Sequence, residues 1–186
     1  MEQCEQQWIE DIRSGNESAF EEMFRAYYPR LCRFAAEYVD STNRARDLVQ
    51  DVFLRIWERR EEWVVRRSLK AYLYQAVRNR ALNQARNEDT KQSVEEDLQY
   101  RTDGRERRTA TDAIHANTLS EEVEAAIQAL PERRRMAFLL HRRHGLTYKE
   151  IACAMGITAK TVENQIGRAL KTLRNELAPL FSHRLK

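Results

Sequence analysis

Helix breakers are scarce in this sequence, and strand signals are absent. Among 186 residues there are only five Gly and three Pro. No run of alternating Val, Ile and Thr predicts a strand. Few breakers beside abundant Ala, Leu, Glu and Arg favour long helices. We therefore expect an all-α protein.

Cysteines, apolar runs and catalytic motifs are also few. The three cysteines (Cys4, Cys32 and Cys153) are widely spaced and odd in number, which argues against a disulfide framework or a cysteine-rich zinc site. No apolar run is long enough to cross a membrane, and the acidic first residues lack the apolar core of an export signal. We expect a cytoplasmic protein without membrane insertion. No Gly-rich phosphate loop, nucleophile elbow or HExxH occurs, so we expect neither a cofactor nor enzymatic activity.

One histidine pair has the spacing of metal ligands. His141 and His144 stand at i and i+3 of an expected helix. The adjacent Arg142 and Arg143 would repel a cation, and no third ligand follows. We interpret the histidines as a surface pair and expect no metal.

Positive charge is unevenly distributed along the chain. The net charge is only +3, yet residues 64–87 contain six Arg or Lys and no Asp or Glu. The stretch from Lys160 onward is also mostly basic. Two separate basic segments indicate a polyanionic partner that is contacted in two places.

Apolar periodicity divides the chain into two small helical domains joined by a flexible linker. Residues 9–87 carry helical stripes; Ser18 and Glu21 have capping-box spacing, and Pro29 is expected to kink or split a helix. Residues 88–117 are polar and mixed in charge, as in a linker. A second helical domain is expected over residues 118–180.

The second domain carries the signature of a helix-turn-helix. Thr147 and Glu150 form a capping box before a short helix, Gly156 suits a left-handed helix end, and Thr158 precedes a longer helix. In such a pair the second helix enters the major groove. The alternative is a helical hairpin with a solvated polar face. The outward residues of the longer helix are Lys160, Thr161, Asn164, Arg168 and Lys171.

Glu163 on the same helix would be unfavourable beside phosphates. We expect it to contact a base amino group or a neighbouring arginine.

The first domain carries two faces of different chemistry. One basic face suits phosphates and base edges, and the nearby Trp63, Tyr72 and Tyr74 could stack on unpaired bases or pack the core. The preceding helix has an acidic–aromatic face, which indicates a protein partner because DNA would repel its carboxylates. The basic face consists of Arg78, Asn79, Asn83 and Arg86, and the acidic–aromatic face of Asp47, Gln50, Asp51, Phe53 and Trp57.

Three segments together resemble one known family. Residues 45–57 (ARDLVQDVFLRIW) resemble the core-polymerase-binding segment of bacterial sigma factors of the extracytoplasmic-function (ECF) group. Residues 70–83 (KAYLYQAVRNRALN) resemble that family's −10-recognition helix. Leu130-Pro131, Phe138 and the segments 147–152, 161–164 and 168–170 resemble its −35-binding domain. The matches follow the family's order over most of the chain.

The resemblance implies a sigma factor that binds RNA polymerase core and directs promoter-specific initiation of transcription. The acidic–aromatic face would meet, or support the surface that meets, the coiled coil of the β′ subunit. The basic face would hold the −10 strand, and the loop with Trp63, Arg66 and Arg67 would capture a flipped base. The −35 element would be read by Lys160, Thr161, Glu163, Asn164, Arg168 and Lys171.

The resemblance also implies partners: the polymerase β and β′ subunits, promoter DNA, and an anti-sigma factor. In the branch of the family that these segments resemble, the anti-sigma factor is membrane-bound. Two alternatives remain from the sequence. A response-regulator-type activator would need an N-terminal sheet domain, and a helical adaptor would leave the two basic surfaces unexplained.

Overall fold

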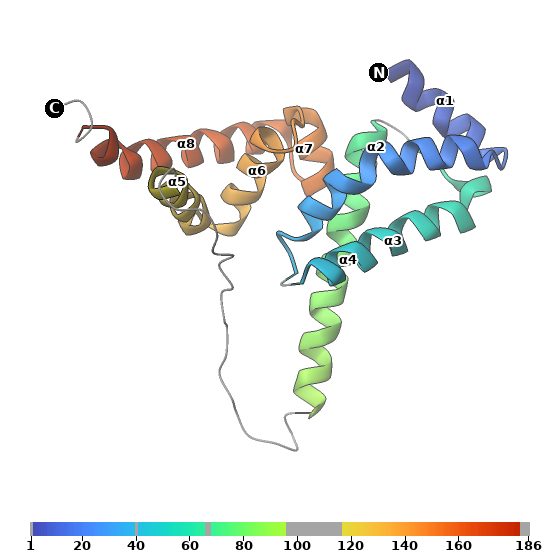
Figure 1. The fold of residues 1–186 in the computed structure, drawn as a ribbon, viewed down its shortest axis with the longest axis horizontal. Coiled ribbons are helices and arrows are strands. Elements are labelled where there is room, and N and C mark those ends of the chain that lie inside the picture. Colours follow the sequence, from blue (N-terminus) through green and yellow to red (C-terminus); the bar gives the residue numbers. More distant parts are fainter. Residues whose placement is uncertain (1, 40, 66–67, 96–116, 183–186) are drawn as a thin grey trace.

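The computed structural model describes residues 2–39, 41–65, 68–95 and 117–182, with the outermost side chains of some of these ranges left out. The described chain contains α-helices and one short 3₁₀ helix and no strand, which confirms the expected all-α class (Figure 1). The elements are α1 (Glu2–Arg13), α2 (Glu17–Ala35), α3 (Thr42–Glu58), η1 (Arg60–Glu62), α4 (Leu69–Glu95), α5 (Asn117–Ala129), α6 (Glu132–Arg142), α7 (Tyr148–Met155) and α8 (Ala159–Ser182).

The N-terminal unit, α1–α4, is built around an aromatic core. The α2 helix packs against α1, α3 and α4, and the side chain of Phe34 on α2 is completely buried. Phe53 of α3 lies between two rings of α2, with centroids 6.0 Å from Phe20 and 4.8 Å from Phe24. Burying a side chain of this size contributes about 1.5–3 kcal/mol, so these contacts fix the angle between α2 and α3.

The start and middle of α2 differ from the sequence expectation. Asn16 caps the helix, and its Oδ1 accepts a hydrogen bond from the Ala19 amide at 3.1 Å. Ser18 therefore lies inside the helix. Pro29 also lies inside α2 without splitting it, because the buried Tyr27 and Leu31 hold the helix on the core on both sides of it.

The α4 helix continues to Glu95, so the first residues of the expected linker are helical. Residues 88–95 contain neither Gly nor Pro, and a helix that is already nucleated extends through such a stretch at little cost. The rest of that linker, residues 96–116, lies outside the described residues.

The C-terminal unit, α5–α8, contains the helix-turn-helix at α7–α8. The capping box is formed: the Thr147 amide donates to Glu150 Oε2 at 2.7 Å, and the Glu150 amide donates to Thr147 Oγ1 at 3.3 Å. Gly156 ends α7 in the left-handed conformation at φ 66°, and Thr158 Oγ1 accepts from the Thr161 amide. These end signals set the turn that orients α8.

The two units are docked on each other along a contact that we call the seam. The first turns of α4 pack on α7, and one continuous hydrophobic core extends from Ile9 to Ile166 (Figure 1). Ser68 Oγ donates to Glu150 Oε1 at 3.0 Å, and Lys70 Nζ donates to the Gly145 carbonyl at 2.6 Å. The far side of the C-terminal unit has its own small core, formed by Ala126, Ile127, Leu130, Leu139, Ala169 and Leu173.

Candidate nucleic-acid interfaces

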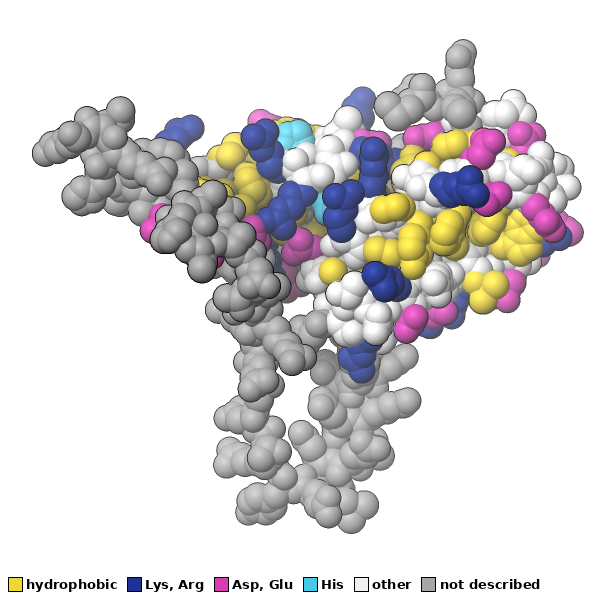
Figure 2. Space-filling view, viewed as in Figure 1, with side chains coloured by type: hydrophobic (Ala, Val, Ile, Leu, Met, Phe, Trp, Pro, Cys, Tyr) yellow, Lys and Arg dark blue, Asp and Glu magenta, His cyan; other side chains and the backbone are white. Residues whose placement is uncertain are grey.

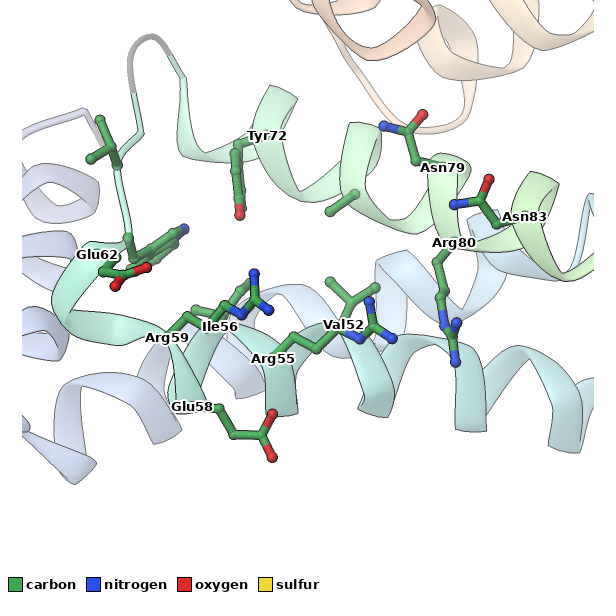
Figure 3. Close-up of a pocket in the computed structure, with 13 residues that line it drawn as sticks. Val52, Arg55, Ile56, Glu58, Arg59, Glu62, Tyr72, Asn79, Arg80 and Asn83 are labelled. Atoms are coloured by element: carbon green, nitrogen blue, oxygen red, sulfur yellow. The ribbon is translucent and has the colours of Figure 1, made fainter.

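A groove of about 790 Å³ lies between α3 and α4 in the N-terminal unit. Figure 3 shows Arg55 and Arg59 reaching from α3 toward the space below α4, with the Tyr72 hydroxyl pointing toward them. Guanidinium groups bind phosphate, and an aromatic ring or an amide contacts a base. The groove therefore has the chemistry of a site for single-stranded nucleic acid. Its polar lining comes from Arg55, Glu58, Arg59, Glu62, Tyr72, Asn79, Arg80 and Asn83, in which three cations outnumber two carboxylates.

Two residues of the expected basic face line this groove. Asn79 and Asn83 are exposed and stand one helical turn apart on α4 (Figure 3). Arg78 is half-buried near Tyr38, where it partly offsets the effect of burial, which raises the pKa of that phenol. The side chains of Arg66, Arg67 and Arg86 lie outside the described residues.

The aromatic side chains near the groove are divided between core and surface. Trp63 is only 5% exposed and packs edge-on against Tyr72, so it forms part of the groove wall and does not project to receive a base. Tyr74 is fully buried. Residues two apart on a helix point about 200° apart, so Tyr72 and Tyr74 cannot share a surface. Of the three, Trp63 and Tyr72 line the groove, and Tyr72 is the less buried of the two.

The sequence analysis missed the groove cations Arg55, Arg59 and Arg80. Arg55 lies in the last turn of α3, and Arg59, four residues later, is the C-cap of that helix, which carries the face assigned to a protein partner. The spacing of Arg55 and Arg59 was visible in the sequence. Their position opposite α4 depends on the packing of the two helices.

The acidic–aromatic face is also partly core. Phe53 is 2% exposed, so of the two roles expected for the residues of this face, contact or support, its position fits support from below. Trp57 is half-buried, and its ring centroid lies 5.0 Å from that of Phe20. The Arg60 guanidinium lies over the Trp57 ring. Asp47 and Gln50 are exposed.

The exposed Leu54 was missed by the sequence analysis. Its side chain is 54% exposed, and with Asp47 and Gln50 it follows an i, i+3, i+7 pattern on one side of α3. Figure 2 shows apolar side chains gathered in a stripe where α2 and α3 lie side by side. An apolar surface edged by carboxylates and amides is typical of a protein interface.

Asp51 connects this face with the groove. Its Oδ2 accepts a hydrogen bond from the Arg80 guanidinium at 2.6 Å, from α3 to α4. Both side chains are partly exposed, so the pair contributes about 0–1 kcal/mol. Its main effect is to hold Arg80 at the end of the groove.

The α8 helix presents a polar face to solvent. Lys160, Asn164 and Arg168 are exposed, and Thr161 is half-buried because its amide and hydroxyl are engaged by Thr158. Glu163 Oε2 pairs with Lys160 Nζ at 2.9 Å, so its partner is a lysine and not the arginine that we expected. This pairing partly neutralises a carboxylate that would otherwise repel phosphate.

His141 and His144 do not form the expected surface pair. His141 is exposed, and its Nδ1 lies 3.0 Å from the Leu146 carbonyl. His144 belongs to the seam: its Nδ1 lies 3.1 Å from the Tyr74 hydroxyl, and its ring meets Phe34 edge-on. Burial, followed by the charges of Arg33, Arg143 and Lys70, lowers the pKa of His144 to about 4. Within the described residues, no cluster of three metal-ligating side chains occurs.

Among the described residues, none of the helices combines the length and the apolarity that a bilayer crossing requires.

Comparisons with known proteins agree with this geometry. The Sigma-70 region 2 family matches residues 23–90, and the Sigma-70, region 4 family matches residues 120–173. The chain is 26% identical over 180 residues to the ECF RNA polymerase sigma-E factor of Escherichia coli, covering 93% of this chain and 94% of that protein. It is also 26% identical over 170 residues to the factor SigE of Mycolicibacterium smegmatis, covering 89% of this chain and 65% of that one.

Two solved structures share the fold. CnrH, solved with the cytosolic domain of CnrY, has a TM-score of 0.67 and 21% identity, covering 95% of this chain and 98% of that one. RpoE of Bartonella quintana, solved with the anti-sigma factor NepR, has a TM-score of 0.65 and 22% identity, covering 86% and 96%. With region 2 on α2–α4 and region 4 on α5–α8, this chain belongs to the RNA polymerase sigma factors of the extracytoplasmic-function group.

Proposed function

We propose that this sigma factor binds RNA polymerase core through the exposed side of α3 and reads promoter DNA through the α3–α4 groove and α8. The observation that carries the proposal is an apolar and acidic surface on α3 that is separate from two cationic surfaces, the α3–α4 groove and the outer face of α8. The protein would supply recognition and no catalysis, in the cytoplasm, where polymerase and chromosome meet.

Asp47, Gln50 and Leu54 would make the polymerase contact. Their common side of α3 offers one apolar side chain with polar groups one turn away, which matches a partner helix that carries apolar and basic residues. Asp51 would act at the edge of this surface and through Arg80. Phe53 and Trp57 would keep α3 at a fixed angle.

The α3–α4 groove would hold the non-template strand of the −10 element. Arg55, Arg59 and Arg80 are placed to contact phosphates, and Tyr72, Asn79 and Asn83 to contact bases. Moving a base out of the duplex costs a few kcal/mol of free energy because stacking is lost, and these contacts would offset that cost.

The α8 helix would read the −35 element in duplex DNA. Lys160, Thr161 and Asn164 lie in its first turns, where base edges are reached, and Arg168 and Lys171 lie nearer the backbone. Thr158 and Ala159, at the start of α8, line a pocket with Ser68 and Ala71 of the N-terminal unit. A DNA duplex bound to the first turn of α8 would collide with the N-terminal unit. We therefore infer that the seam opens before the −35 element is bound.

An anti-sigma factor would be the partner that opposes this opening. The Bartonella quintana RpoE was solved with the anti-sigma factor NepR, and CnrH with the cytosolic domain of a second protein, CnrY. For the present chain we propose a partner of the same class, anchored in the membrane.

Run-off transcription with purified core polymerase tests the proposal. The protein should start RNA synthesis at defined chromosomal sites that core enzyme alone ignores. Asp51→Ala should reduce core binding, whereas Glu61→Ala, an exposed acidic residue of η1, should not. Normal core binding by Asp51→Ala would contradict its role.

The α8 assignment has a separate measurement. The double variant Lys160→Ala, Arg168→Ala should weaken binding to a −35 duplex and reduce the slope of log K against log salt by about two. Arg25→Ala, which removes an exposed cation of α2, serves as the control. An unchanged salt slope in the double variant would refute the α8 assignment.

A further inference from the structure

A second cleft, of about 700 Å³, lies on the seam away from the surfaces described above. One wall comes from the end of α2 and the other from the end of α6 and the following turn. Figure 2 shows Lys and Arg side chains gathered around a histidine where the C-terminal helices meet α2. We call it the arginine cleft. Its lining residues are Arg30, Arg33, Ala36, Glu37, Arg142, Arg143, His144 and Gly145.

The walls of the arginine cleft carry an excess of positive charge. Of its four arginines, only Arg143 forms an ion pair within the described residues, with Glu37 at 3.3 Å and with Glu124. Arg33 Nε donates only to the Pro29 carbonyl, at 3.4 Å. The guanidinium groups of Arg30, Arg33 and Arg142 therefore have donors available for a ligand.

The positive field reaches the floor of the cleft. Burial raises the pKa of Tyr74 to about 12, and the charges of Arg30 and Arg33 act in the opposite direction. If the Tyr74 hydroxyl donates to Nδ1 of His144, then Nε2 carries the ring proton. That Nε2 is buried and has no hydrogen-bond partner. His144 lines the cleft together with the three available guanidiniums, so the cleft walls carry an excess of hydrogen-bond donors.

We propose that the arginine cleft binds a small, multiply charged phosphate anion and that the bound anion holds the two units together. Arg30 and Arg33 would bind it from the N-terminal unit and Arg142 from the C-terminal unit. Forked guanidiniums bind phosphate oxygens in pairs, and the volume fits a ligand of nucleotide size. A single carboxylate would leave most of the available donors unused.

The anion would act as a clamp because each wall belongs to a different unit. A ligand that binds only the docked form stabilises that form in proportion to its concentration relative to Kd. Binding itself is independent of the function proposed above. The consequence rests on that function: the anion would delay opening of the seam and lower the apparent affinity for the −35 duplex.

Isothermal titration calorimetry on the full chain tests the site, with inorganic tripolyphosphate and ATP as probes. Arg33→Ala and Arg142→Ala should each weaken binding at least tenfold, because each removes one wall's contact. Arg25→Ala, an equal charge change on α2 outside the cleft, should change Kd less than twofold. Equal affinities for both probes would identify the polyphosphate as the ligand, and tighter ATP binding a nucleotide. Failure of both probes to bind, or equal losses in all three variants, would overturn the proposal.

A single-stranded oligonucleotide serves as a third probe. Tighter binding of this probe than of tripolyphosphate, lost in Arg33→Ala and Arg142→Ala, would assign the cleft to nucleic acid and overturn the small-anion assignment.

Hydrogen exchange tests the clamp. Tripolyphosphate should slow amide exchange in residues 69–77 of α4 and 148–155 of α7, and this slowing should be absent in Arg142→Ala. Unchanged exchange at saturating tripolyphosphate would overturn the clamping role. Neither measurement uses polymerase, so a negative transcription assay would leave the anion site standing, and a negative calorimetric result would leave the sigma function standing.

Discussion

The two units of this protein differ in how their buried apolar side chains are grouped. The N-terminal unit joins α1–α4 in one aromatic core, whereas the C-terminal unit divides its apolar side chains between two clusters. Its α6–α7 side contributes Met136, Leu140 and Ile151 to the core of the N-terminal unit, while α5 and much of α8 pack around Leu139 and Leu173. The C-terminal unit therefore depends on its neighbour on one side and is self-sufficient on the other.

This difference separates two properties that a DNA reader needs. The turn that orients α8 is secured by local end signals at Thr147, Gly156 and Thr158, which do not require the N-terminal unit. The seam adds stability that is lost when the units part. The recognition helix can thus keep its orientation relative to α7 in both arrangements.

The largest expected effect on the free energy of unfolding comes from truncating one large side chain in each core. Phe34→Ala should cost about 3–5 kcal/mol and also loosen the seam, because the Phe34 ring contacts both Tyr74 and His144. Leu173→Ala should cost about 2 kcal/mol, the low end for such a change, and leave the seam intact. Urea denaturation with hydrogen exchange at α7 measures both. Equal loosening of the seam by the two variants would abolish the distinction between the two cores.

An intermediate effect is expected from pH. The pKa of His144 is lowered from 6.5 to about 4, so the opened form takes up a proton first as the pH falls through that window. The stabilisation of the docked form by the neutral His144 ring is fully present above about pH 6.5. Below that pH this stabilisation falls by at most about 1.4 kcal/mol per pH unit, and by less where water screens the ring. Tyr74, Arg33, Lys70 and Arg143 all face this ring, and none supplies a negative charge to a protonated form.

The measurement is seam exchange between pH 7 and 5.5. Burial raises the pKa of Glu37, so protonation of this carboxyl acts in the opposite direction to protonation of His144. His144→Gln should be nearly insensitive to pH in this range. A wild-type seam that opens no faster at pH 5.5 than at pH 7 would show that His144 is not the titrating group.

The smallest effect separates the local end signals from the seam. Thr147→Ala removes the cap of α7 and should cost about 1 kcal/mol in the C-terminal unit. Ser68→Ala removes both the donor to Glu150 and the acceptor for the Ala71 amide, so it should speed exchange in α4 and at the seam. If Thr147→Ala left the free energy of unfolding unchanged, α7 would owe its start to packing and not to its cap.

Periodicity and end signals predicted most helices of this fold, together with the capping box and the left-handed Gly156. The failures have a common physical cause. Trp63 and His144 look like surface residues in a local window, but each packs against a tyrosine of α4, Trp63 against Tyr72 and His144 against Tyr74. Arg55 was missed because the groove exists only after α4 packs beside α3. Local sequence specifies helices and their ends, and long-range packing decides which polar groups meet.

One carboxylate takes part in both the start of a helix and the docking of the two units. Oε2 of Glu150 accepts from Thr147, and Oε1 accepts from Ser68. Burial acts to raise the pKa of Glu150, but these bonds and the charge of Lys70 lower it overall. Fraying of the first turn of α7 would break the link to α4, and separation from α4 would leave that turn freer to fray. A change in the first turn of α7 is thereby communicated, through two oxygens of one side chain, to the unit that carries the α3–α4 groove.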